Sequence, residues 1–243
     1  MRRELAMQTK ITIPNYTLAE ELISAISHGI GTGLAIAACV LCIVKGARDH
    51  VGAAGIVSAA IFGATMIFLY CMSTLYHSIT AKGAKRVFRV IDHCSVFLLF
   101  AGTFSPFSLV SLRGSRGWTI FGIIWGLTVL GIIFNAINVD KYEKVSAIIN
   151  VLMGWLVVIS FRSLAAAVSP RGVLLLLIGG LVYTVGAVFY GLGKRIRYMH
   201  SIWHFFVLGG TICHFFAVYL EVLCGERSAL ANENIRLHSS ASR

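Results

Sequence analysis

Long apolar runs without charge alternate along the chain with short connections that carry its charged residues. The uncharged runs cover residues 22–44, 50–81, 93–112, 117–139, 145–161, 172–193 and 198–220. A helix needs about 20 apolar residues to cross a bilayer, so the pattern predicts seven membrane-spanning helices. The second run is too long for one helix and includes connecting residues. The fifth is short, and we expect it to continue past Arg162, whose side chain can reach the interface.

The spans and their short connections predict one compact all-α membrane domain, a seven-transmembrane-helix bundle. We expect this domain to cover residues 20–223, with spans at about 22–44, 53–77, 90–112, 117–139, 145–167, 172–193 and 198–220. Residues 1–19 form an N-terminal segment without an apolar run long enough for a signal peptide. The polar residues 224–243 are expected to form a disordered tail.

Small residues and one proline predict local features of the bundle. Gly29 with Gly33, and Gly122 with Gly126, fit the small-residue spacing of closely packed membrane helices. Pro106 lies well inside the third span, where it predicts a kink.

Composition supports the membrane assignment and removes one class of partner. The chain is 57% hydrophobic and only 13% charged, whereas soluble domains carry about 25% charged residues. Its formal net charge of +11 could suggest a nucleic-acid partner. The basic residues lie between apolar spans, however, where they anchor and orient a membrane protein, so we expect no nucleic acid to bind.

The distribution of lysine and arginine predicts the orientation. The N-terminus and the second, fourth and sixth connections carry twelve of these residues, against seven near the membrane on the other side. Positive charge favours the cytoplasmic side. We therefore expect a cytoplasmic N-terminus and, after seven spans, a C-terminus outside.

Ionisable and polar residues gather at one membrane face. His200 and His204 are four residues apart at the start of the last span, so they share one face of a helix. His77 ends the second span, and Asp92 lies near the start of the third. Even-numbered spans end, and odd-numbered spans begin, on the side of the N-terminus. All four residues therefore lie at that face, and Ser73 lies one helical turn deeper than His77.

This set of residue types predicts a metal site. Ionisable groups inside a bilayer are costly and mark functional sites by default, and three imidazoles beside an open position are typical of catalytic zinc. We predict that His77, His200 and His204 bind zinc, although copper, iron and nickel also accept imidazole. Zinc would lower the pKa of a water to about 7. Asp92 could then take or orient its proton, and Ser73 could hydrogen-bond the water or a developing oxyanion.

A structural alternative exists for each of these residues. Each side chain could simply hydrogen-bond between helices, but five at one depth and one face favour a site. His28 and Glu21, near the start of the first span, are candidates to hydrogen-bond the metal ligands or to form an interfacial polar pair. His214 lies about 15 Å deeper than His204, too far for the same ion. We expect Asn135, Asn138 and Asn150 to tie helices together.

The motifs also resemble a known family, the bacterial hemolysin III proteins. These are the prokaryotic arm of the progestin and adipoQ receptor family, within a superfamily of seven-helix metal hydrolases that includes alkaline ceramidases. The resemblance covers residues 18–222. It is carried by Glu20-Glu21, Ser27-His28-Gly29-Ile30-Gly31, Ser73-Thr74-Leu75-Tyr76-His77, Asp92-His93-Cys94, Ala101-Gly102-Thr103-Phe104-Ser105-Pro106, His200-Ser201-Ile202-Trp203-His204 and Cys213-His214-Phe215.

The resemblance implies a seven-helix fold with a cytoplasmic N-terminus in the bacterial inner (plasma) membrane. It implies zinc on His77, His200 and His204, with Asp92 and Ser73 nearby. For eukaryotic relatives it implies receptor function linked to ceramide hydrolysis. For the bacterial arm it implies a hemolysin label and a role in membrane-lipid homeostasis.

Three functions remain open at this stage. The first is a zinc-dependent hydrolase that cleaves an amide or ester of a membrane lipid or fatty-acyl substrate. The second is a non-enzymatic lipid sensor or receptor with structural zinc. The third is a pore-forming hemolysin, which the sequence supports poorly because a secreted pore former needs a soluble state. The sequence identifies neither the lipid nor the oligomeric state.

Overall fold

All regular elements of the described part of the chain are helices. The computed structural model describes residues 11–112, 114–159 and 161–224. Six of its helices are long and apolar enough to cross a membrane, so the chain is a multi-pass helical membrane protein, as the apolar runs predicted. The helices are α2 (Leu18–Arg48), α3 (Gly52–Ser78), α4 (Lys82–Pro106), α5 (Gly114–Ile159), α6 (Phe161–Ala167), α7 (Pro170–Leu192) and α8 (Met199–Ala217). The predicted tail lies almost wholly outside the described residues.

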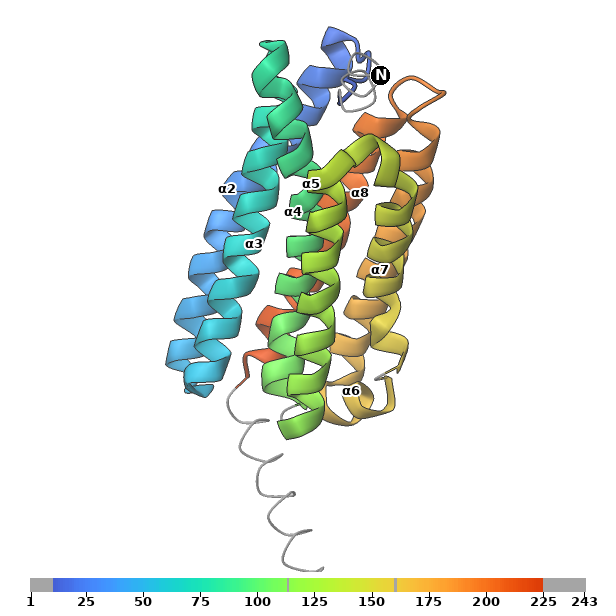
Figure 1. Ribbon diagram of the computed structural model, residues 1–243. Helices are drawn as coiled ribbons and strands as arrows, with labels where there is room; N and C mark the ends of the chain where they lie inside the picture. Colours follow the sequence, from blue (N-terminus) through green and yellow to red (C-terminus); the bar gives the residue numbers. More distant parts are fainter. Residues whose placement is uncertain (1–10, 113, 160, 225–243) are drawn as a thin grey trace, which may run out of the picture.

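Helix α5 is a hairpin rather than one straight helix. Its backbone leaves the helical region at Asn138, where φ is −166° and ψ is 101°. Across this break the Ser146 hydroxyl donates to Asn135 Oδ1 at 2.7 Å. Arg116, near the start of α5, donates to Ser163, just past its end. Figure 1 shows the two arms side by side. The span predicted at 117–139 falls on the first arm, whereas the one predicted at 145–167 runs beyond the second arm, which ends at Ile159, into α6.

Local sequence explains where several helices begin and where an α-helix gives way to a π-helical turn. The Thr17 hydroxyl accepts from the Glu20 N–H, and the Glu20 carboxylate accepts from the Thr17 N–H, a reciprocal cap that starts α2. Ser169 caps α7 just before Pro170. At Pro106, which lacks an N–H, α4 gives way to a π-helical turn, η1 (Phe107–Leu112). A second π-helical turn, η2 (Val218–Val222), continues α8.

Helix α4 lies inside the bundle, and α2 lies between α3 and α8. α4 with η1 is the most deeply buried of the membrane-length helices. α2 packs against both α3 and α8, and α7 packs against α8. Large apolar side chains on the outer faces are exposed, as expected where lipid surrounds a helix, among them Leu22, Ile26, Ile30 and Leu34 of α2.

The predicted glycine pairs do not make the close contacts within this chain. Gly33, Gly122 and Gly126 have no atom within 4 Å of the place a Cβ would take, so that prediction was wrong. Close approach occurs elsewhere, at Gly102 against Thr65 and at Gly63 against Cys39. Spacing alone does not say which way a helix face turns, and helix rotation is set by the whole bundle.

One end of the bundle collects the segments that carry most of the predicted polar residues. In Figure 1 the N-terminal segment, the α3–α4 connection, the turn of α5 and the loop between α7 and α8 all lie at this end. Asp140 at the α5 turn accepts from Arg89 of α4 and from the N–H of Thr12. These contacts hold the N-terminal segment across this end of the bundle.

Candidate metal centre

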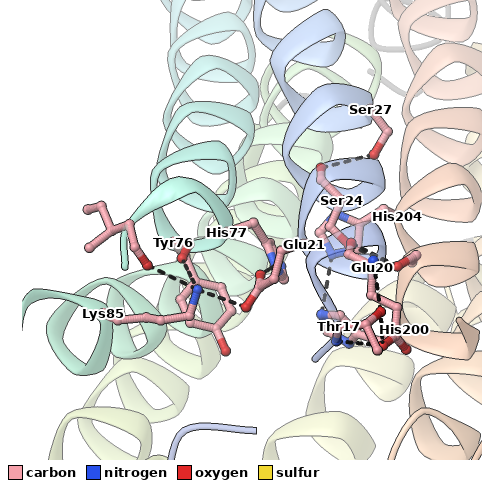
Figure 2. A network of polar contacts seen from close by, with 12 residues as sticks. Thr17, Glu20, Glu21, Ser24, Ser27, Tyr76, His77, Lys85, His200 and His204 are labelled. Atoms are coloured by element: carbon pink, nitrogen blue, oxygen red, sulfur yellow. Dashed lines mark hydrogen bonds and ion pairs between the residues drawn. The ribbon is translucent and has the colours of Figure 1, made fainter. Parts of the chain in front are cut away.

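Three histidines from two helices form a buried cluster at this end. His77 comes from the last turn of α3, and His200 and His204 come from the first turns of α8. One nitrogen from each ring lies within 4.8 Å of the other two. Nε2 of His200 and Nε2 of His204 are 3.3 Å apart. All three residues are buried, and Figure 2 shows them around the start of α2.

A carboxylate sets the tautomer of the neutral His77 ring. Its Nδ1 lies 2.6 Å from Glu21 Oε2, and the other Glu21 oxygen lies 2.8 Å from Lys85 Nζ, as Figure 2 shows. A carboxylate accepts, so Nδ1 carries the proton and Nε2 presents a lone pair. Lys85 also donates to the backbone oxygens of Tyr76 and Ile79. The basic side chain therefore anchors the carboxylate that orients the ring.

The donor set suits a zinc ion. Two imidazole nitrogens bound to one tetrahedral zinc at 2.0–2.1 Å are about 3.3–3.4 Å apart, close to the 3.3 Å between His200 and His204. His77 Nε2 is buried and has no hydrogen-bond partner among the described residues. A buried lone pair without a partner is unusual in a folded protein. A cation at this point would satisfy it.

Ser73 and Asp92 lie together on the wall next to the cluster. Ser73 is one turn before His77 on α3, and its hydroxyl hydrogen-bonds the Asp92 carboxyl of α4. Both residues line a cavity that His200 and His204 also line. Ser73 is buried, while Asp92 keeps part of its surface accessible. An acceptor and a hydroxyl thus face the same space as two of the histidines.

His28 hydrogen-bonds the backbone of the cluster rather than one of its ring nitrogens. Its Nε2 donates to the backbone oxygen of His204 at 3.3 Å, and the two ring centres are 4.0 Å apart. The edge of the ring also meets Tyr70. Of the two α2 residues considered from the sequence, Glu21 is therefore the one that hydrogen-bonds a ring nitrogen of the cluster, and His28 supports the α8 backbone.

The N-terminal segment covers the cluster, which the sequence did not indicate. The Tyr16 ring stacks on His200 with centres 4.9 Å apart and planes 17° apart. Burial raises the pKa of the Tyr16 phenol, so its hydroxyl stays protonated at neutral pH. Sequence reasoning also missed Lys85, which was counted only as a basic residue of the second connection. Both contacts depend on how segments distant along the chain meet.

The cavity beside the cluster is narrow and largely apolar, with a volume of about 90 Å³. One wall carries the polar residues Ser73, Asp92, His200 and His204. The facing wall comes from α5 and α7. Apolar residues complete the lining, among them Leu69, Val96, Phe100, Val151 and Val207.

Comparisons with known proteins find similar sequences. A family model described as Haemolysin-III related matches residues 16–215. Hemolysin-3 of Bacillus cereus is 41% identical over 217 residues, covering 89% of this chain and 98% of that protein. The Hemolysin-3 homolog of Bacillus subtilis (strain 168) is 43% identical over 203 residues, covering 84% and 94%. The human Monocyte to macrophage differentiation factor is 27% identical over 173 residues, covering 67% and 69%. No solved structure matches the chain.

Proposed function

This chain belongs to the haemolysin-III related family, and we propose that it is a zinc-dependent hydrolase that cleaves an amide or ester of a membrane lipid. One observation carries the proposal. Three buried imidazoles lie within 4.8 Å of one another, and a carboxylate and a hydroxyl line the same apolar cavity as two of them. A role in membrane-lipid homeostasis follows from a site that takes lipid out of the surrounding bilayer.

The roles of the residues follow from their contacts. His77, His200 and His204 would hold zinc, and a bound zinc ion supplies hydroxide at neutral pH by lowering the pKa of a water to about 7. Asp92, on the cavity wall, would accept the proton of the attacking water. Ser73, hydrogen-bonded to Asp92, would donate to the oxyanion that develops on the substrate. Glu21 would keep the His77 ring in the tautomer that leaves Nε2 free.

We propose that seven segments cross the bacterial inner membrane. The break at Asn138 divides α5 into two arms, and the five other membrane-length helices bring the crossings to seven. The basic residues gathered at the end that holds the N-terminal segment favour a cytoplasmic N-terminus. The C-terminus would then lie outside, and the metal centre would lie at the cytoplasmic headgroup level.

Metal analysis tests the centre first. We would measure zinc in the detergent-purified protein, prepared without chelators, beside the variant His77→Ala/His204→Ala. The expected result is about one zinc per chain in the wild type and none in the variant. His214→Ala is a matched control because this buried histidine lines the deep part of the cavity and bonds the backbone of Leu176 instead. Absence of metal from the wild type after zinc is added back would remove the hydrolase mechanism.

One observation favours a lipid sensor with structural zinc as the second candidate. Tyr16 lies stacked on His200, so the N-terminal segment lies against one of the three histidines. Incubation of the zinc-loaded protein with lipid amides and esters, followed by mass analysis of the products, separates the candidates. Cleaved lipid that depends on Asp92 supports the hydrolase. Saturable lipid binding with no product supports the sensor. Zinc-independent single-channel conductance would instead favour a pore.

A further inference from the structure

A second hollow, which we call the lateral groove, lies between the start of α2 and the α3–α4 connection. Its volume is about 680 Å³, and the N-terminal segment also contributes to its lining. Among the described residues, none lines both the lateral groove and the cavity that Ser73 and Asp92 line. A ligand in the lateral groove would therefore be a different molecule from the substrate of the proposed hydrolase.

The α4 side of the lateral groove is basic. Lys82, Lys85 and Arg86 line it from the first two turns of α4, and Glu21 is the only acidic side chain among its described lining residues. Glu21 is already paired with Lys85 at 2.8 Å, as Figure 2 shows. Lys82 and Arg86 have no ion-pair partner among the described residues. Two positive charges are thus left without an anion.

The position of these two cations on α4 makes an anion between them favourable. A helix N-terminus carries a partial positive charge, which acidic residues normally offset, but the first turn of α4 holds none and Ala81 gives it no side-chain cap. Lys82 and Arg86 are four residues apart, a spacing at which like charges repel. Arg86 Nε is also buried without a hydrogen-bond partner among the described residues, a state that few native groups keep.

The α2 side of the lateral groove is mostly apolar and reaches the lipid-facing surface. It is formed by Leu18, Leu22 and Ala25, and Ile11 and Ile13 of the N-terminal segment lie beside them. Leu18 is 76% exposed and Leu22 is 49% exposed. A small water-soluble anion would use only the basic side of the groove. The two sides together fit a molecule that joins an anionic headgroup to an acyl chain.

We propose that the lateral groove binds an anionic phospholipid. Its phosphate lies between Lys82 and Arg86, and an acyl chain lies along Leu18 and Leu22. Basic pockets between membrane helices bind anionic headgroups in this way. A zwitterionic lipid would bring its own cation to the same place, where the two basic side chains would repel it. The lipid does not take part in the proposed hydrolysis, so the site does not depend on whether the metal centre is catalytic.

Native mass spectrometry of the detergent-purified full chain tests the site. We would titrate the protein with phosphatidylglycerol and with phosphatidylcholine that carries the same acyl chains. The expected result is a single phosphatidylglycerol per chain, held clearly more tightly than phosphatidylcholine. Lys82→Gln/Arg86→Gln should lower the affinity for phosphatidylglycerol by about 30-fold, because each basic residue near an anionic lipid contributes about fivefold. Lys85 is left unchanged because it holds Glu21. Lys82→Gln alone, with an expected loss of about fivefold, serves if the double variant fails to fold.

Lys141→Gln/Lys144→Gln is the matched control. It removes two exposed positive charges near the turn of α5, at the same end of the bundle, and neither residue lines the lateral groove. Its affinity for phosphatidylglycerol should equal that of the wild type. Both double variants should keep the wild-type zinc content, which separates lipid binding from the metal centre.

Three results would overturn the proposal. An equal loss of affinity in the two double variants would mean that the lipid is attracted only by the general positive charge of this end. Equal binding of phosphatidylglycerol and phosphatidylcholine would remove the selection for an anionic headgroup. Displacement of the lipid by inorganic phosphate at the same concentration would mean that the groove takes a free anion and that the acyl chain contributes nothing.

Discussion

The metal centre and the facing wall of the cavity beside it differ in the partners that hold their polar groups. At the metal centre, His77 is held by Glu21, and Glu21 is held by Lys85 at 2.8 Å. On the facing wall, Asn135 accepts from the Ser146 hydroxyl, a neutral group. Both regions keep buried polar atoms without a partner among the described residues, among them His77 Nε2 and Asn150 Oδ1. The difference between them is therefore the charge of the partners and not the number of unpaired atoms.

The charged partner indicates how the metal centre is organised. A ring whose second nitrogen is fixed by a carboxylate keeps one orientation, which suits a metal ligand that must not reorganise. The amide of Asn135 is held by a neutral hydroxyl instead. The metal centre therefore has the stronger of the two supports, since hydrogen bonds to charged groups are about twice as strong as those between neutral groups.

The largest expected effect comes from the acceptor on the histidine wall. Asp92→Asn removes the proton acceptor and keeps the shape of the side chain. Lipid cleavage should fall by about 10²–10⁴-fold, the usual range for a general base, while the zinc content stays at the wild-type level. Product formation and elemental analysis measure the two quantities separately. Asp49→Asn, at the other end of α2 and paired with Lys45, is the matched control and should keep full activity. Full turnover by Asp92→Asn would remove the assigned role.

An intermediate effect is expected from the carboxylate that holds His77 at the metal centre, compared with a carboxylate on the facing wall. Glu21→Gln removes the charge that orients His77, and we expect a 10–100-fold loss of zinc affinity, measured by competition with a chromogenic chelator. Glu143→Gln alters the carboxylate of the facing wall, which contacts Lys194 and Tyr190 rather than a histidine. Its zinc affinity should match the wild type. Equal losses of zinc affinity in the two variants would mean that the negative charge acts over a distance and that the hydrogen bond between Glu21 and His77 is not needed.

The smallest effect is expected at the exposed ion pair of the facing wall. The Lys194 side chain is 55% exposed, whereas that of Lys85 is 9% exposed. Exposed pairs contribute about 0–1 kcal/mol, while removing one partner of a buried pair costs about 3–5 kcal/mol. Lys194→Gln should therefore unfold within a few degrees of the wild type in detergent, and Lys85→Gln at a clearly lower temperature. Similar shifts for the two variants would contradict the comparison.

Much of the membrane architecture was predictable because its signal is local. A run of apolar residues must span the bilayer as a helix, since unpaired backbone groups cannot face lipid. Counting the runs also predicted that His77, Asp92, His200 and His204 lie near one end of the bundle, and the structure brings the three histidines together, with Asp92 bonded to Ser73 one turn before His77. The glycine pairs failed as contacts because spacing along one helix carries no information about its rotation.

The sequence did not show which side chain hydrogen-bonds which histidine in the cluster; that required the tertiary structure. From the sequence, Glu21 and His28 were equal candidates to support the ligands. The packing of α2 between α3 and α8 turns Glu21 to His77 Nδ1 and His28 to the His204 backbone. The path of the N-terminal segment likewise places Tyr16 on His200. The residues around Tyr16 in the sequence do not indicate that contact, because His200 is far away along the chain.

Hydrophobic length and helical spacing act within single segments, so they were enough to predict a membrane-spanning helical bundle with His77, His200 and His204 near one end of it. Which nitrogen meets which carboxylate, and which amides stay unpaired in the cavity, became clear only from the folded structure. Those outcomes depend on the rotation and offset of neighbouring helices, and these are set by the packing of all side chains together.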